Sequence, residues 1–545
     1  MSTTSERIEV ASLLPDRPRL EKRHEILRVS LLLILITLTT KILAYVVQAK
    51  KASYFGIGPV VDCYEWAIFF PTLIYSFAFN VLNTLLVPVF SGRETSPSLE
   101  RAYHTLVTWC LLGFFVLGII LILFAPWFVV WFSDFDDPQR RALATLFLSI
   151  LACAALFIGI EGVQSGFLLA EKRAVTVSLV RLIKEIGFVG VIVTGFKLLG
   201  DQLLPVGWLV SAAVGGIIFL GLGIRRHRFD FRLVHVDDNI RLLFRNLWPV
   251  LVLFLLINLN DLVRIKLLSA QTGNLATYRY AYYIFLLPHI LIAENLVLFL
   301  FPLMAAEVNQ GDFERLRHSI RSGVKLTLFF ILPASVGLIV LARPIVQLLY
   351  ERHQFQAADT SATTLPLIYL SLGMWAFGLH VVFARTLDAL QAYWRRVAVE
   401  LSYVALSIVL SLWWIRRFGH SGAAWSFSVS CVFLLALEIW QVRRRIGIIH
   451  MRWVVGDLIK IAAATGAMAV VARIGYWWGG SWFAEPKAIA LLIRLGGAIA
   501  LALITYVGCS LALKVVRGAD LVELRDYFLL RRSAGSEEDA GSKTA

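Results

Sequence analysis

The sequence predicts an all-α integral membrane protein with about 14 transmembrane helices, built as two parallel six-helix repeats followed by two additional helices. Its composition is strongly apolar, with 58% hydrophobic residues, 16% charged residues and a mean hydropathy of +0.74. Soluble domains carry about 25% charged residues. Apolar runs of about 20 residues recur along the chain, each long enough to cross about 30 Å of hydrocarbon as a helix.

The expected transmembrane helices follow one another with short connections. Each is an apolar run whose length suits a membrane-spanning helix. In chain order they cover residues 29–49, 65–90, 105–133, 143–170, 175–197, 204–224, 246–269, 280–305, 323–342, 363–386, 395–415, 421–441, 454–477 and 488–514.

An internal duplication relates the two halves of the chain. Gly273 and Pro288 follow Gly56 and Pro71 by the same 217 residues, and further matches continue at an offset of 214. A period of this length is too long for a solenoid, whose units contain about 20 to 50 residues. Because each repeat has an even number of helices, both enter the bilayer from the same side, which predicts parallel repeats.

The distribution of Lys and Arg predicts the orientation, because cytoplasmic segments retain basic residues. This distribution predicts a multi-pass protein of the bacterial inner membrane with both termini in the cytoplasm. We expect a cytoplasmic N-terminal segment at 1–27, a first bundle at 28–224, a basic linker at 225–245, a second bundle at 246–445, two additional helices at 446–515 and a disordered cytoplasmic tail at 516–545.

The net charge of +15 is explained by this topology and by anionic lipid headgroups, so no nucleic-acid partner is expected. The sequence contains no phosphate-binding loop, no H-E-x-x-H pair and no G-x-S-x-G turn. The five cysteines are scattered and show no metal-ligand spacing. We therefore expect a transporter rather than an enzyme, without a cofactor, and with H⁺ and Na⁺ both open as coupling ions.

Polar side chains at membrane depth are the candidate site, because a charge in hydrocarbon is costly and tends to face a wet cavity. Two local pairings are the alternative explanation: Arg181 with Glu185 at i, i+4, and Arg264 with Asp261 at i, i+3. The candidate cavity residues are Lys41, Asp62, Arg181, Lys184, Arg264, Arg279 and Tyr283.

Arg279 occupies the repeat position of Asp62, so the two opposite charges are candidates for a gate between the repeats. The alternative is that each lies at a wet helix end.

Tyr283 belongs to a tyrosine cluster typical of the bilayer interface, or of a sugar-binding cavity. Weaker candidates for ion sites, or for hydrogen bonds between helices, are Asn80, Asn83, Glu161, Glu294, Asn295, Glu400 and Glu438.

Several short segments of the chain form a recognisable set: Lys41-Ile42-Leu43-Ala44-Tyr45, Tyr54-Phe55-Gly56, Asp62, Pro71, Val87-Pro88, the run 348–355 and Gly419-His420-Ser421-Gly422-Ala423-Ala424. These segments resemble the MurJ/MviN lipid II flippases, a family within the superfamily of multidrug, oligosaccharidyl-lipid and polysaccharide exporters. The resemblance covers roughly residues 28 to 515, including the two helices after the duplication.

The resemblance implies a flippase that carries a polyprenyl-pyrophosphate-linked glycan by alternating access, with the lipid tail held near the last two helices. The family's acidic cavity position is Asp62, and its first-helix arginine corresponds to Lys41. Its other cavity arginines fall at Val47, Tyr75, Ser76 and Tyr283. Losing these guanidinium groups, which suit phosphate, favours an exopolysaccharide repeat unit over lipid II as the substrate.

Three functions therefore remain: a lipid-linked glycan flippase, a cation-coupled multidrug exporter and a membrane glycosyltransferase. The positive charge of Lys41 disfavours the exporter, and the external loop near 343–362 is too short for a catalytic domain. The expected partners are the lipid-linked glycan and membrane lipids. The protein is expected to be monomeric and to associate with proteins of cell-envelope glycan synthesis.

Overall fold

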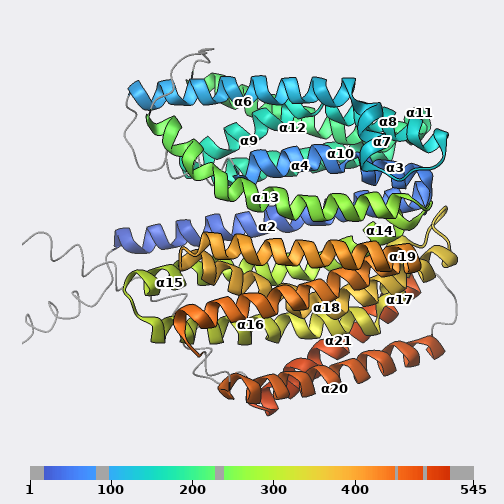
Figure 1. Cartoon of the computed structure of the whole chain (residues 1–545). Coiled ribbons are helices and arrows are strands. Elements are labelled where there is room, and N and C mark those ends of the chain that lie inside the picture. The colour runs from blue at the N-terminus through green and yellow to red at the C-terminus, as the bar shows by residue number, and fades with distance from the viewer. Residues whose placement is uncertain (1–16, 82–96, 228–237, 449–451, 483–487, 516–545) are drawn as a thin grey trace, which may run out of the picture. The chain divides into compact units, whose positions relative to one another are not determined.

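The computed structural model describes residues 17–81, 97–227, 238–448, 452–482 and 488–515, and all secondary structure in these ranges is helical (Figure 1). The chain divides into two compact units. The first contains Met1–Ala276 with Arg352–Phe355, and the second contains Thr277–Glu351 with Gln356–Ala545. The expected tail at 516–545 and most of the expected N-terminal segment lie outside the described residues.

The first unit contains the helices of the first repeat and the first long helix of the second. In order they are α2 (Arg17–Phe55), α3 (Pro59–Ala67), α4 (Phe69–Ser76), η1 (Phe77–Val81), α6 (Pro97–Leu123), α7 (Ala125–Phe132), α8 (Pro138–Ala152), α9 (Ala155–Ala170), α10 (Ala174–Thr194), α11 (Phe196–Leu199), η2 (Gly200–Gln202), α12 (Leu203–His227) and α13 (Asp238–Ser269).

The second unit continues the repeat and adds the two C-terminal helices. Its elements are α14 (Asn274–His289), whose first residues still belong to the first unit, η3 (Ile290–Glu294), α15 (Asn295–Asn309), α16 (Phe313–Val340), α17 (Ala342–Tyr350), α18 (Ala357–Ala389), α19 (Tyr393–Ile446), α20 (Arg452–Trp482) and α21 (Ala488–Ala512).

The backbone confirms the internal duplication. Gly56 and Gly273, which are 217 residues apart, both have positive φ angles, +57° and +86°. Such angles favour glycine because it has no Cβ. Phe124 and Leu341, separated by the same offset, interrupt α6–α7 and α16–α17, and a proline follows each break within three residues. In the first unit the break bends the helix by 74°.

Eight described helices are long and apolar enough to cross a membrane, or nine if the bent pair α6–α7 counts as one span. The expected total of about 14 therefore stays a prediction. Two expected spans, 395–415 and 421–441, are the two halves of α19, which breaks at Gly419 (φ +53°, ψ −132°). The expected span 65–90 begins as three shorter pieces, α3, α4 and the π-helical segment η1.

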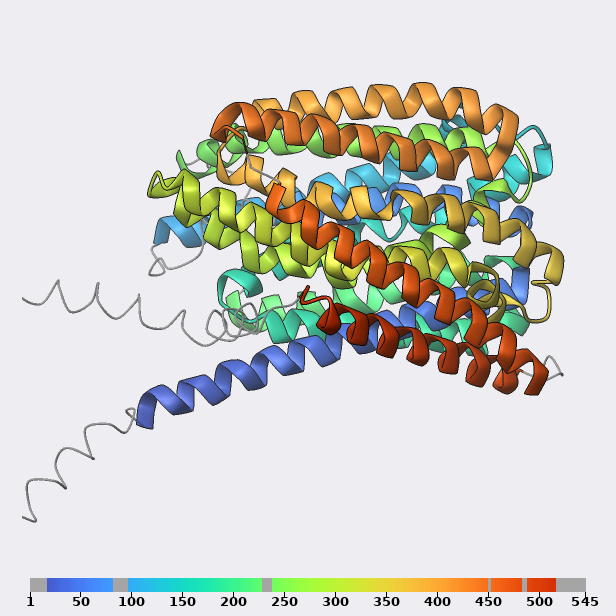
Figure 2. The same ribbon diagram turned by 90° about the horizontal axis from the view of Figure 1, so that it is seen from below.

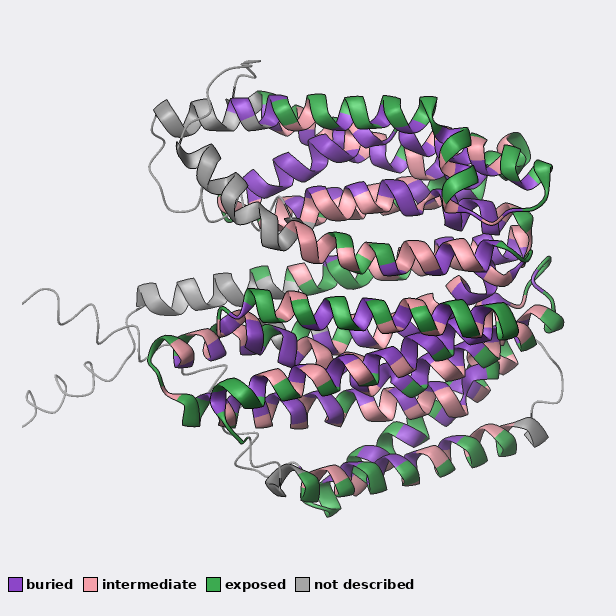
Figure 3. Cartoon of the chain, in the orientation of Figure 1, coloured by how far each residue is buried: buried purple, intermediate pink, exposed green. Residues whose placement is uncertain are grey.

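Large apolar side chains cover much of the described surface, as lipid contact requires. On α6 they form an exposed face that includes Leu112, Phe115 and Ile119 (Figure 3). Within the second unit, α20 and α21 run side by side and pack on α16 and α17 (Figure 2). Small residues let helix backbones approach: a Cβ at Gly162 on α9 would lie 2.4 Å from Ala78.

Candidate functional site

A buried ion pair joins α9 to α10 in the first unit. Lys184 Nζ lies 2.5 Å from Glu161 Oε2, and the two side chains are 14% and 1% exposed. Gly215 on α12 makes room for the lysine, because a Cβ there would lie 2.4 Å from Lys184 Cδ. Lys184 was an expected site residue, whereas Glu161 was one of the weaker candidates.

Aromatic rings from the second expected helix lie against the charges of α10. Lys184 Nζ is 5.1 Å from the centre of the Tyr75 ring, and Arg181 Cζ is 3.8 Å from the centre of the Phe79 ring. These are cation–π distances. The i, i+4 pairing of Arg181 with Glu185 is not formed within the described residues, because the guanidinium stacks on Phe79 and does not reach the carboxylate.

Lys41 on α2 belongs to the same group of charges. Lys41 and Lys184 both interact electrostatically with Glu185, and α2 packs directly on α10. We call Lys41, Glu161, Arg181, Lys184 and Glu185 the cationic cluster. Three positive and two negative side chains leave it one formal positive charge, which suits an anionic group such as a phosphate.

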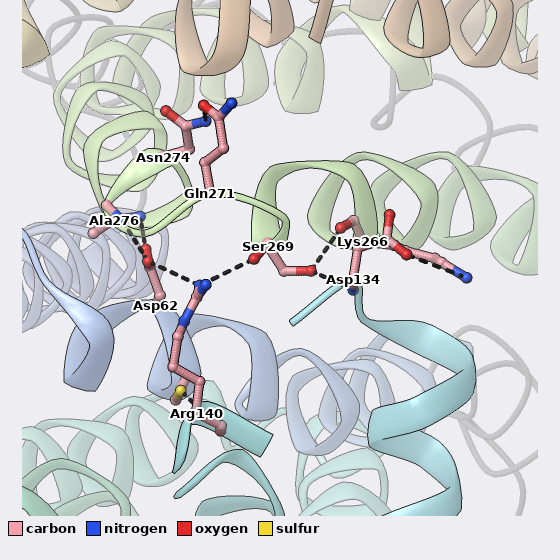
Figure 4. A network of polar contacts seen from close by, with 10 residues as sticks. Asp62, Asp134, Arg140, Lys266, Ser269, Gln271, Asn274 and Ala276 are labelled. Carbon is pink, nitrogen blue, oxygen red and sulfur yellow. Dashed lines mark hydrogen bonds and ion pairs between the residues drawn. The ribbon is translucent and has the colours of Figure 1, made fainter. Parts of the chain in front are cut away.

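Asp62 lies on α3, fully buried, and its carboxylate is held by three donors (Figure 4). The backbone N–H groups of Gly273 and Ala276 donate to it at 2.5 and 2.8 Å, at the start of α14. Arg140 Nη2 donates to it at 3.4 Å and to the carbonyl of Ser269 at 3.0 Å. Asp62 therefore caps a helix whose positive end favours a carboxylate.

Burial raises the pKa of Asp62 to about 6, because desolvation outweighs the two backbone hydrogen bonds and the charge of Arg140, which favour the ionised form. Asp62 precedes the expected span 65–90 and lies outside the eight long apolar helices. At neutral pH the carboxylate is mostly ionised and pairs with Arg140.

Ion pairs also join the described charges near the C-terminal end of α13, one within the helix and one to a distant residue. Arg264 Nη1 donates to Asp261 at 2.7 Å, so the i, i+3 pairing considered from the sequence is formed. Lys266 lies 3.7 Å from Asp134, whose backbone N–H donates to Ser269 Oγ at 2.8 Å (Figure 4). These contacts connect α13 to the turn between α7 and α8.

Arg279 and Tyr283 lie half-buried on α14 in the second unit, where Tyr278 and Tyr282 stack with ring centres 5.8 Å apart. The pairing of Asp62 with Arg279 stays a prediction. Asn83 and Val87-Pro88 lie outside the described residues, as do the side chains of Asn80 and Glu294.

Two buried charged residues, Arg140 and Lys51, are absent from the candidates selected from the sequence. Arg140 follows the N-terminal cap of α8, in the connection between the expected spans 105–133 and 143–170, yet it is 5% exposed. Lys51 forms a buried ion pair with Glu65, and both side chains are 1% exposed. The sequence feature that could have identified both residues as buried charges is their position beside apolar runs, in a protein with little polar surface.

Comparison with known proteins agrees with this architecture. The family described as lipid II flippase MurJ matches residues 51–492. A probable lipid II flippase MurJ from Synechocystis is 26% identical over 466 residues, which cover 81% of this chain and 85% of the relative. One from Rhizobium meliloti is 24% identical over 543 residues, covering 92% and 96%.

Two solved structures have the same fold. The inward closed conformation of a lipid II flippase MurJ aligns with a TM-score of 0.74 at 20% identity, covering 89% of this chain and 99% of that chain. An inward-facing multidrug resistance MATE transporter of the MOP superfamily aligns with a TM-score of 0.65 at 13% identity, covering 75% and 95%. The predicted fold class is confirmed.

Proposed function

Because this chain belongs to the lipid II flippase MurJ family, we propose that it moves a polyprenyl-pyrophosphate-linked glycan from the cytoplasmic to the periplasmic leaflet. The observation that carries the proposal is the cationic cluster, whose net positive charge lies among apolar helices. A pyrophosphate offers several charged acceptor oxygens to Lys and Arg donors. The same positive charge would repel the cationic drugs that a multidrug exporter carries.

Binding would proceed by exchange at Lys184. Without substrate, Glu161 neutralises the lysine, which lowers the cost of burying both charges. An arriving pyrophosphate replaces the carboxylate as the partner of Lys184, while Arg181 and Lys41 contribute further positive charge. Return of Glu161 to Lys184 then favours release, so the site avoids holding its product too tightly.

Lipid II is the first candidate substrate. The resemblance places two of the family's cavity arginines at Tyr75 and Ser76, and α10 brings Lys184 to the Tyr75 ring and Arg181 to the Phe79 ring. Positive charge is therefore supplied at this place from a different helix. The exopolysaccharide repeat unit, which the missing arginines favour, is the second candidate, because these cations replace only part of the bidentate guanidinium set.

Complementation tests the function. The gene is expressed in a bacterium depleted of its essential lipid II flippase, with membrane abundance measured in parallel. We expect survival with the wild-type chain and loss of survival with Lys184→Ala. The matched control is Lys197→Ala, which removes an exposed lysine of α11 and should leave rescue unchanged.

Two outcomes separate the substrates. Rescue supports lipid II, whereas a well-expressed wild-type chain that fails to rescue overturns lipid II. In the second case, a strain that lacks an exopolysaccharide flippase becomes the decisive host. The proposed topology, with both termini in the cytoplasm, is tested on the same cells by labelling of terminal cysteine tags with membrane-impermeant reagents.

A further inference from the structure

Three ionisable side chains meet inside the second unit, on helices that the cationic cluster does not include. His380 lies on α18, Glu400 on the first half of α19 and Glu438 on its second half. One nitrogen or oxygen from each lies within 4.8 Å of the others. Glu400 is 3% exposed and Glu438 is fully buried. We call these residues the triad.

The break at Gly419 makes the triad possible. It allows the two halves of α19 to pack against each other, as the contact of Ser411 Oγ with Ser426 Oγ at 2.8 Å shows. Both halves also pack on α18, where Gly373 lies so close to Ser428 that a Cβ would not fit. Two glutamates separated widely in sequence are thereby buried together.

One buried carboxylate oxygen of the triad accepts no hydrogen bond. His380 Nδ1 lies 2.9 Å from Glu438 Oε1, whereas the second carboxylate oxygen of Glu438, Oε2, has no hydrogen-bond partner. A buried carboxylate oxygen without a donor is costly. The side chain of His380 is 17% exposed, more than that of either glutamate, so the histidine is the most accessible member of the triad.

The neighbouring charges do not neutralise the triad. Arg396, one turn before Glu400, interacts electrostatically with the triad but donates both to Asp388 Oδ1 and to Asp388 Oδ2, so these two charges cancel. Arg385 also pairs with Asp388, at 3.2 Å, so two arginines and one aspartate leave one positive charge, which solvent screens because Arg385 is half exposed. His289 on α14 also interacts electrostatically with His380, and its ring stacks on Phe377 with ring centres 4.1 Å apart. Two carboxylates then face one imidazole, and a buried net negative charge requires a cation.

The geometry favours a proton over a metal ion. Na⁺, Mg²⁺ and Ca²⁺ prefer sites made of oxygen atoms, whereas this triad includes an imidazole. Structural zinc takes four protein ligands, whereas other zinc sites use three and a water, so Zn²⁺ is included as a competitor in the labelling experiment below. The distance between His380 Nδ1 and Glu438 Oε1 is that of a hydrogen bond, which already requires a proton between them.

We propose that His380, Glu400 and Glu438 form a proton-loading site that couples the transport cycle to the pH gradient across the membrane. A proton that arrives at His380 Nε2 lets Nδ1 pass its own proton to Glu438. The imidazole returns to a neutral tautomer, and Glu438 becomes a carboxylic acid, which stays neutral in the buried site. Glu400 is the second acceptor, and unloading reverses these steps. The coupling rests on the proposed transport function, whereas proton binding does not.

Carbodiimide labelling tests proton binding without any substrate. Dicyclohexylcarbodiimide modifies protonated carboxyl groups in apolar surroundings, and mass spectrometry locates the adduct on the purified full-length protein. From about pH 5 to about pH 9, we expect an adduct at Glu438 or Glu400 that declines about tenfold per pH unit above its midpoint. His380→Gln should shift that midpoint, whereas Glu307→Gln, which alters a buried glutamate bonded to Ser319 at 2.7 Å, should not.

The wild-type labelling alone can overturn the proposal, so it does not depend on a variant that folds. No adduct at either glutamate at any pH would overturn it. Labelling that Na⁺ or Zn²⁺ blocks at constant pH would also overturn it, because a metal ion would then occupy the site. A pH-dependent adduct that neither ion affects supports the proton site.

Transport in proteoliposomes tests the coupling. At a fixed membrane potential, we expect an imposed pH gradient to change the rate for the wild-type and Glu307→Gln proteins, and to leave Glu438→Gln unaffected. A wild-type rate that is insensitive to the gradient overturns the coupling. Absence of any wild-type transport together with pH-dependent labelling overturns the proposed function and leaves the proton site in place.

Discussion

Glu161 on α9 and Lys184 on α10 form an ion pair that is almost completely buried, although 23 residues separate them in the sequence. Replacing Lys184 with Met leaves an unpaired carboxylate among apolar helices. Breaking such a pair costs about 3 to 5 kcal/mol. We expect a lower thermal midpoint in detergent for Lys184→Met.

The double variant Glu161→Gln with Lys184→Met separates stability from function. Removing both charges should restore most of the lost thermal stability, because no unpaired charge remains. Transport should stay absent, because the anion-binding charge is gone. A single Lys184→Met protein as stable as the wild type would contradict the buried pair.

Lys41→Arg is expected to improve substrate binding. The substitution keeps the positive charge and adds the planar fork that binds phosphate oxygens in pairs. One additional hydrogen bond to a charged group contributes about 1.5 to 3 kcal/mol, which corresponds to roughly tenfold or more in affinity. The measurement is binding of a polyprenyl pyrophosphate to the purified protein, with Lys41→Met as the variant that should weaken it.

Asp62→Asn should destabilise the first unit, because both carboxylate oxygens accept hydrogen bonds, from Arg140, Gly273 and Ala276, whereas the NH₂ group of asparagine can only donate. An unsatisfied buried donor costs about 1 to 3 kcal/mol. Asp134→Asn is the control, because its ion pair with Lys266 is 39% exposed on both sides and should contribute about 1 kcal/mol or less. Equal thermal midpoints for the two variants would contradict the role of Asp62.

The pH dependence of stability should also identify Asp62. Burial raises its pKa from 3.8 to about 6, so between these values the folded state keeps a proton that the unfolded state has lost. The contribution of Asp62 to the free energy of unfolding therefore decreases as pH rises through this window, by at most about 1.4 kcal/mol per pH unit. The measurement compares the thermal midpoints of the wild-type and Asp62→Asn proteins at several pH values. Parallel curves for the two proteins would refute the assignment.

Gly419→Ala is expected to destabilise the second unit by about 1 to 3 kcal/mol, because a side chain is strained at φ +53°, ψ −132°. Gly466→Ala on α20 is the matched control. A Cβ there meets nothing within 4 Å, and alanine favours the helix. We expect its thermal midpoint to equal or exceed that of the wild type, and the reverse order of the two variants would sink the explanation.

The sequence alone was sufficient for the all-helical membrane fold and its duplication. A chain in lipid must satisfy its backbone hydrogen bonds internally, so apolar runs of spanning length become helices. The repeat was visible because backbone requirements recur: Gly56 and Gly273 share a positive φ. The spacing in the sequence was also sufficient to predict an ion pair within one helix, because Arg264 contacts Asp261 one turn away.

Only the tertiary structure decided which charges meet across helices. The i, i+4 spacing allows Arg181 to pair with Glu185, but in the folded unit Arg181 stacks on Phe79. Packing of α9 on α10 instead pairs Glu161 with Lys184. Asp62 accepts a hydrogen bond from a backbone amide 211 residues away, and Arg140 joins it from a third helix. Hydrophobic periodicity specifies that a helix is buried, but the partner of a buried charge depends on helix rotation, depth and side-chain reach, which packing of the whole unit sets.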